Sequence, residues 1–144
     1  MKISVIVPCV NSFEKKRKSI ELTLKQLLRQ NYESYEIVCV TGGNKDGTEQ
    51  YLKDVSEQDD RVILHVHPDK PSRSVARNSG AKAASGEVLL FLDDDTIVRS
   101  RNTFKMIEKI MKNNVYALGA RRKWLPLGWR YDEVWHSLDC GDLG

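Results

Sequence analysis

The chain has little of what marks a membrane or secreted protein. No apolar run approaches the ~20 residues of a membrane-spanning helix. The opening segment, Met1 to Val7, is too short and too weakly basic to be a signal peptide. The three cysteines, Cys9, Cys39 and Cys140, form an odd number without metal-ligand spacing. These absences favour a protein of the reducing cytoplasm.

A strong excess of charge is also absent. The formal net charge is +3, which is too small to indicate a nucleic-acid partner. Basic residues do cluster at Lys15 to Lys18, where a solvated face is the better interpretation, and at Arg121 to Lys123. The second cluster fits a solvated face as well as it fits a phosphate or an anionic membrane surface. Peripheral contact with the inner face of a membrane therefore stays open.

Length and hydrophobic pattern predict one main domain, in which short apolar runs alternate with helical stretches. We expect strands at 3–7, 36–40, 62–66, 87–92 and 115–119, and helices at 15–30, after Asp46, at 72–84 and at 103–113. This order predicts an α/β fold with a doubly wound, Rossmann-like, mostly parallel sheet over residues 1–120. The segment 121–144 has no clear periodicity, so we expect an irregular tail there.

Two of the helices carry more detailed expectations. Asp46 is expected to cap the second helix, with Glu49 completing a capping box. The third helix is rich in small residues, which permit close approach to its neighbours. Its expected inner face consists of Val75, Ala76, Ser79, Gly80, Ala83 and Ala84.

Three consecutive aspartates follow the apolar run Val88 to Leu92, where a buried strand leaves the core. Adjacent carboxylates repel one another, so a fixed and partly buried cluster costs free energy unless a cation is present. If the backbone stays extended, Asp93 and Asp95 point to one side and Asp94 to the other. Mg²⁺ typically takes one or two protein carboxylates, with water and phosphates in its other positions. The alternative is a solvated acidic turn that caps the next helix.

In doubly wound sheets, ligands bind outside the carboxyl ends of the strands. The segments to examine are therefore 8–12, 41–47 and 93–96. Backbone amides of the loop 42–48 could approach an anionic group, although an ordinary strand-to-helix turn is equally consistent. Arg77 and Asn78 precede the acidic strand and have the chemistry to bind a phosphate or a ribose, whereas a surface arginine is the alternative.

Five motifs together resemble the nucleotide-binding portion of the family 2 glycosyltransferases, over about residues 1 to 120. They are Ser4 to Cys9 with Asn11, Asp46 to Thr48, Ala76 to Gly80 with Ala83, Ser85 to Glu87, and Phe91 to Thr96. The resemblance implies a fold of the nucleotide-diphospho-sugar transferase type (GT-A). It also implies an enzyme that moves a sugar from a nucleotide-diphospho-sugar to an acceptor hydroxyl, with inversion. Asp93 and Asp95 match the motif that meets the diphosphate through Mn²⁺ or Mg²⁺.

The resemblance further implies which residues bind the donor. Pro8 and Asn11 match the loop under the base, and Arg77 matches an arginine near the nucleotide. The donor-binding residues that we expect are Pro8, Asn11, Gly43, Asp46, Arg77, Asn78, Asp93 and Asp94.

The sequence departs from the family pattern at three places. Val10 stands where an aromatic residue is usual, and Thr41 and Gly42 replace a pair of aspartates. The carboxylate expected to recognise the base is therefore missing. The segment after the metal motif is short. Asp139 is our candidate catalytic base among its acidic residues. The alternative is that all of these acidic residues are surface charges of an incomplete acceptor region. A truncated or catalytically silent nucleotide-sugar-binding module is the rival interpretation.

The tail is rich in aromatic residues. They include Trp124, Trp129, Tyr131 and Trp135. A contiguous apolar patch of several hundred Å² usually marks an interface. We therefore expect the tail either to pack over the donor site as part of an acceptor wall or to mediate self-association into a homo-oligomer.

Overall fold

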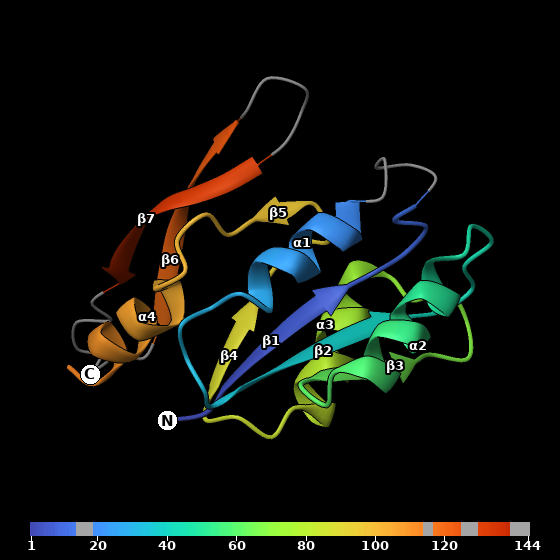
Figure 1. The fold of residues 1–144 in the computed structure, drawn as a ribbon, viewed down its shortest axis with the longest axis horizontal. Coiled ribbons are helices and arrows are strands. Elements are labelled where there is room, and N and C mark those ends of the chain that lie inside the picture. The colour runs from blue at the N-terminus through green and yellow to red at the C-terminus, as the bar shows by residue number, and fades with distance from the viewer. Residues whose placement is uncertain (14–18, 114–116, 125–129, 139–144) are drawn as a thin grey trace.

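The structure, a computed structural model, describes residues 1–13, 19–113, 117–124 and 130–138 (Figure 1). Strands and helices alternate through most of it. The elements in chain order are β1 (Ile3–Pro8), α1 (Ser19–Leu27), β2 (Tyr35–Thr41), α2 (Thr48–Gln58), β3 (Val62–Val66), α3 (Arg73–Ala83), β4 (Val88–Phe91), β5 (Thr96–Ile97), α4 (Thr103–Met111), β6 (Ala117–Trp124) and β7 (Arg130–Leu138). No helix in this described part has both the length and the apolar character needed to cross a membrane.

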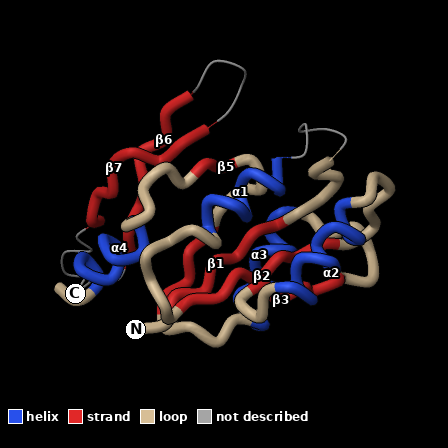
Figure 2. The backbone as a smooth tube through the Cα atoms, in the orientation of Figure 1, coloured by secondary structure: helices blue, strands red, loops and turns tan. Residues whose placement is uncertain are grey.

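The main sheet is parallel and has the strand order β3-β2-β1-β4. β1 lies between β2 and β4, so the chain moves outward from β1 to β3 and then crosses back to the other side of β1. Figure 2 shows these strands side by side, with helices on both faces. The reversal next to β1 is the point at which doubly wound sheets open a crevice for ligands. The predicted fold class is confirmed.

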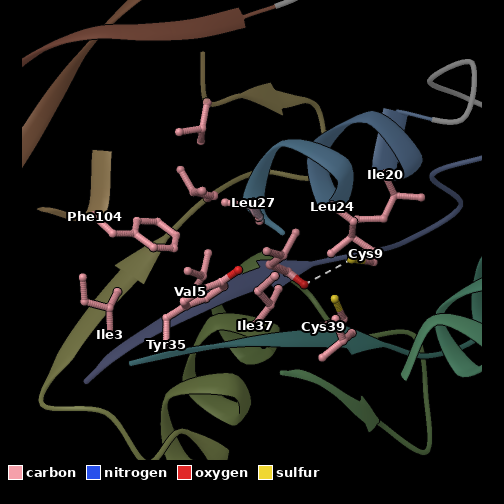
Figure 3. Packing of buried hydrophobic residues seen from close by; sticks show 14 of the residues in the cluster. Ile3, Val5, Cys9, Ile20, Leu24, Leu27, Tyr35, Ile37, Cys39 and Phe104 are labelled. Carbon is pink, nitrogen blue, oxygen red and sulfur yellow. Dashed lines mark hydrogen bonds between the residues drawn. The ribbon is translucent and has the colours of Figure 1, made fainter. Parts of the chain in front are cut away.

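The two faces of β1 belong to two different cores. Ile3, Val5 and Val7 are fully buried and pack against α1, α2 and α4 in the larger cluster (Figure 3). Ile6 points to the opposite face and packs with Val38, Val40 and Ala76 of α3. A strand buried on both faces reads as a continuous apolar run, which is why the sequence indicated it clearly.

α3 lies close to the sheet along a narrower stripe than the sequence predicted. Ala76 and Gly80 are buried, but Val75 and Ala83 of the expected inner face are exposed. A Cβ on Gly80 would lie 2.5 Å from Cγ2 of Ile6 and 2.9 Å from Cγ2 of Val40. Because the helix backbone itself contacts the strands at Gly80, side chains further round the helix do not reach them.

A second sheet, with the order β5-β7-β6, corrects the prediction of an irregular tail. β6 and β7 are antiparallel, and β7 also pairs with the two-residue strand β5. The strand predicted at 115–119 corresponds to β6, which lies in this sheet and runs on to Trp124. The pairing register shifts between Arg121 and Arg122. A bulge of this kind interrupts the two-residue alternation from which a strand is recognised in sequence.

Candidate functional site

The loops that follow β1, β2, β3 and β4 meet at one edge of the main sheet, because parallel strands bring their carboxyl ends together. Asn11 lies in the first of these loops and has a left-handed backbone, with φ of 49°. Its N–H donates to Oδ1 of Asn44 at 2.7 Å, and its own Oδ1 accepts from the N–H of Lys45 at 3.2 Å. Asn11 therefore fastens the loop after β1 to the loop after β2.

Asp46 has a similar joining role. Its carboxylate accepts from the backbone N–H of Phe13 at 2.9 Å and of Thr48 at 3.1 Å. The predicted capping box is wrong, because the residue at the cap of α2 is Gly47, which has no side chain to donate or accept. Asp46 supports the start of α2 from one residue further out.

The three aspartates differ in environment. Asp94 is only 3% exposed, and its carboxylate accepts from the hydroxyl of Ser12. Thr23 on α1 donates to the main-chain oxygen of Asp94 at 3.0 Å. The N–H of Thr96 donates to the main-chain oxygen of Asp93 at 3.1 Å, which closes a turn, so the backbone here is not extended. Asp93 and Asp95 nevertheless remain half-buried while Asp94 is buried.

Asp93 forms an ion pair with Arg77 of α3. Nη2 of Arg77 donates to Oδ1 of Asp93 at 2.9 Å, and the side chains are 38% and 14% exposed, respectively. Nε of Arg77 is buried and has no hydrogen-bond acceptor among the residues that the structure describes. The cationic residue and the first aspartate expected at the donor site are therefore in direct contact.

A cavity of about 270 Å³ opens beside this pair. It is lined by Pro8, Val10, Lys70, Pro71, Arg73, Ala76, Asp93 and Asp94. The lining thus combines apolar residues with two aspartates and two cationic residues. Of the donor-binding residues expected from the sequence, Asn11, Gly43, Asp46, Arg77 and Asn78 do not line it within the described part of the chain, although Arg77 contacts its wall.

Lys70 and Arg73 were missed in the sequence analysis. They follow β3, the one strand of the main sheet whose carboxyl end was not examined. The strand-end rule applies to that strand as well and would have identified them.

The absence of the base-recognising carboxylate has a structural counterpart. Gly42 is buried, and a Cβ there would lie 2.6 Å from the main-chain oxygens of both His67 and Asp69. Gly43 has a φ of 59°, and a Cβ on it would lie 2.9 Å from Cβ of Lys70. The loop after β3 therefore occupies the space that a side chain at Gly42 would need, and this packing also places Lys70.

The chemistry of the donor set suits a hard divalent cation. Asp93 and Asp95 offer carboxylate oxygens, which Mg²⁺ and Mn²⁺ prefer. Across the described residues, no group of three or more His, Cys, Asp or Glu side chains could enclose a metal ion. A site with two carboxylates leaves coordination positions for water and phosphate oxygens, as is usual for Mg²⁺. The candidate base Asp139 lies outside the described residues.

The family is established by comparison with known proteins. The sequence model of the protein family "Glycosyl transferase family 2" matches residues 4–139 of this chain. The fold and the site thus define a glycosyltransferase domain of GT-A type, as the resemblance in the sequence predicted. The chain belongs to glycosyl transferase family 2.

Two curated relatives illustrate the similarity. The chain is 36% identical over 95 residues to glucosyl-dolichyl phosphate glucuronosyltransferase of Haloferax volcanii, covering 66% of this chain and 29% of the relative. It is 31% identical over 106 residues to poly-beta-1,6-N-acetyl-D-glucosamine synthase of Staphylococcus aureus, covering 74% of this chain and 24% of the relative. The chain therefore spans less than a third of either relative's length.

Solved structures agree on the fold. TarS from S. aureus, in complex with UDP, superposes with a TM-score of 0.73 at 26% identity, covering 88% of this chain and 37% of that one. The mannosyltransferase PcManGT from Pyrobaculum calidifontis, in complex with GDP-Man and Mn²⁺, superposes with a TM-score of 0.74, covering 85% of this chain and 36% of that one. Its identity is 21%, so this second match shows the fold alone.

Proposed function

We propose that this chain binds a nucleotide-diphospho-sugar together with Mn²⁺ or Mg²⁺ and takes part in transferring the sugar to an acceptor hydroxyl. The observation that carries the proposal is the cavity at the strand ends, whose lining contains both Asp93 and Asp94 and the cationic residues Lys70 and Arg73. A diphosphate and a cation together need both kinds of charge. Family membership and the UDP complex of the similar TarS structure support the same class of ligand.

In this proposal the residues that line the cavity act together with Asp95 and Arg77 beside it. Asp93 and Asp95 hold the cation, which when bound would offset the charge that develops on the departing diphosphate. Arg77, Lys70 and Arg73 supply positive charge to the phosphates. Pro8 and Val10 provide the apolar surface under the nucleoside. A carboxylate, with Asp139 as the candidate, takes the proton of the acceptor hydroxyl, which attacks the anomeric carbon in line and inverts it.

A contact with the membrane belongs to the proposal as well. The basic run Arg121 to Lys123 lies on β6, and we assign it to contact with an anionic membrane surface on the cytoplasmic side.

Thermal unfolding with a panel of nucleotide sugars, with and without Mn²⁺, tests the proposal. The metal alone should raise the melting temperature slightly, and the metal with a nucleoside diphosphate should raise it further. At a hundredfold excess over the dissociation constant, linkage supplies about 2.7 kcal/mol. For a chain of this size that corresponds to roughly 5–10 °C.

Variants make the test specific. Asp95→Ala should abolish the metal-dependent part of the shift, whereas Asp60→Ala, at an exposed position beyond α2, should keep it. An unchanged shift of nucleotide with metal in Asp95→Ala would remove the metal assignment. Release of sugar from the donor, with and without acceptors, then separates a transferase from a silent binding module.

A further inference from the structure

The ion pair between Arg77 and Asp93 joins two groups that have different partners in the proposed complex. Asp93 is expected to bind the metal, and Arg77 is expected to bind the donor phosphates. In the structure, Nη2 of Arg77 instead lies 2.9 Å from Oδ1 of Asp93. The carboxylate is 14% exposed, so this contact is only partly screened by solvent.

A divalent cation on Asp93 is disfavoured while the guanidinium is in its present place. Arg77 already occupies Oδ1, and a second cation on the same carboxylate would lie close to the guanidinium, whose like charge repels it. A metal that binds alone therefore either bears this repulsion or displaces Arg77, and a displaced guanidinium would lack its counter-ion in a half-buried position, which is costly. Its Nε is already buried without an acceptor among the described residues, so the displaced group has no alternative acceptor that the structure shows.

A diphosphate relieves this cost. Its oxygens can accept from Arg77 in a bidentate manner and can bind the metal at the same time. Each ligand then favours binding of the other, because the metal frees Arg77 for the phosphates and the diphosphate frees Asp93 for the metal. Such a coupling free energy is reciprocal by linkage.

We propose that Arg77 makes the site select the complex of a divalent metal with a nucleoside diphosphate over either ligand alone, by exchanging Asp93 for the phosphates. The inference rests on the proposed function for the identity of the two ligands. Its first consequence, competition between Arg77 and the metal for Asp93, is independent of any nucleotide.

The first experiment measures binding of Mn²⁺ alone, from the electron paramagnetic resonance signal of the free ion. Arg77→Gln should bind Mn²⁺ about 5- to 20-fold more tightly than the original chain, a change typical of allosteric couplings. Lys82→Gln is the matched control, since Lys82 is an exposed residue in the last turn of the same helix. It removes the same charge far from Asp93 and should leave Mn²⁺ affinity unchanged.

The second experiment measures binding of UDP and GDP without metal, by calorimetry. Asp93→Asn frees Arg77, so the nucleotide should bind more tightly than to the original chain. Asp95→Asn is the control, because it removes one carboxylate charge from the same cluster and leaves the contact between Arg77 and Asp93 intact. It should give a smaller gain than Asp93→Asn.

The third experiment measures Mn²⁺ affinity at saturating nucleotide. In the original chain, nucleotide should raise Mn²⁺ affinity at least fivefold, and in Arg77→Gln this factor should be smaller, with only the part that comes from direct ligation of the metal by the diphosphate remaining. Equal or weaker Mn²⁺ binding by Arg77→Gln, an equal gain in Asp93→Asn and Asp95→Asn, or an unchanged coupling factor would each overturn the inference. If no nucleotide binds to any variant, the proposed function fails, while the experiment with Mn²⁺ alone still decides the competition.

Discussion

Glu36 is a buried carboxylate whose role the sequence does not reveal. It lies on β2 and is 4% exposed. Its carboxylate accepts from the hydroxyl of Ser4 at 2.7 Å, from the N–H of Ser85 at 2.7 Å and from the ammonium group of Lys2 at 2.5 Å. Burial on its own raises the pKa of Glu36, but the hydrogen bonds from Lys2, Ser85 and Ser4 outweigh it and lower the pKa from 4.5 to about 2. The family motif at Ser85 thus serves the fold, at the edge opposite the cavity.

We expect Glu36→Gln to destabilise the protein in a pH-dependent manner. Because the pKa of Glu36 is lower in the folded state, its contribution is fully present above pH 4.5 and is lost as the pH falls toward 2. A shift of this size corresponds to about 3 kcal/mol at neutral pH. Urea unfolding over this pH range should show the two proteins differing most at pH 7 and converging in acid.

The matched control is Glu33→Gln, since Glu33 is an exposed residue just before the same strand. Its unfolding free energy should follow that of the original chain at every pH. A constant difference between Glu36→Gln and the original chain, down to the lowest pH, would show that packing rather than the charge of Glu36 is responsible.

We expect recognition of the nucleotide base to depend on the tight packing around Gly42. Because a side chain does not fit there, we expect the proposed donor site to lack a charge-assisted hydrogen bond to the base, worth ~1.5–3 kcal/mol. We expect UDP, GDP and dTDP to bind, in the presence of Mn²⁺, with dissociation constants within about a hundredfold of one another. A larger preference in calorimetry would mean that another residue reads the base, and Lys70 and Arg73 are the first to substitute.

At the scale of single residues, local pattern points to residues at the ends of apolar strands. Pro8, Asp93 and Asp94, which the sequence predicts to bind the donor, line the cavity, and their role in binding stays a prediction. The interlocking of Asn11 with Asn44 and Lys45 joins two loops that are distant in sequence. The contact between Arg77 and Asp93 depends on the distance from α3 to β4. Neither could be predicted, since both arise from tertiary packing.

Among the elements, α3 packs closely against the sheet at Gly80. We expect Gly80→Ala to destabilise the protein, although alanine favours helices over glycine by about 1 kcal/mol. The added methyl would meet branched and buried side chains at 2.5 and 2.9 Å, and such overpacking costs roughly 1–3 kcal/mol. Thermal unfolding should show a lower melting temperature. Ser74→Ala, at an exposed position in the first turn of α3, is the control and should change little.

A higher melting temperature for Gly80→Ala would show that α3 can move away from the sheet at no cost. The position of Arg77, which lies less than one turn away on the same helix, would then not be fixed by packing. The ion pair with Asp93 would have to hold the helix instead.

The elements predicted best are those with a strong and uninterrupted pattern. The bounds of β3 were predicted correctly, and those of β2 within one residue, because each strand carries a run of three or more apolar residues. The helix predicted to end at Gln30 ends at Leu27, and the N–H of Gln30 donates to the main-chain oxygen of Leu27 at 3.2 Å in a tighter turn. β5 is too short to give a signal, and the charges and the register shift of β6 hide its alternation.

At the scale of the whole molecule, the backbone of β7 pairs with β5 through Thr96 with Arg130 and Ile97 with Tyr131. Among the side chains that the structure describes, those from Ile3 to Met111 form a large hydrophobic cluster. The α/β part therefore contains a substantial core.

We expect a chain that ends at Asn113 to fold cooperatively and to keep the stabilisation by nucleotide with Mn²⁺. Sugar transfer should be lost, because the candidate base Asp139 is removed. Circular dichroism and thermal unfolding measure the first two properties, and an assay of transfer measures the third. Loss of the nucleotide-dependent shift would show that the segment beyond Asn113 contributes to the donor site.

Sedimentation of the same two chains tests self-association. If the aromatic tail mediates it, the full chain should sediment as an oligomer at concentrations where the chain ending at Asn113 is a monomer. A monomeric full chain would instead favour the tail as an acceptor wall.

The strand order also determines when the site comes into existence during folding. β1 pairs with β2 across the nearby helix α1, but Ile3 pairs with Val88 of β4, far along the chain. Contacts between residues so distant in sequence form slowly, because the intervening chain must first be closed into a loop. Asp93 reaches the end of β1 only after that last pairing. We therefore expect that a partly folded chain in which β1 to β3 have paired, but β4 has not, cannot bind a ligand at Asp93, and that ligands stabilise only states in which β4 has joined the sheet.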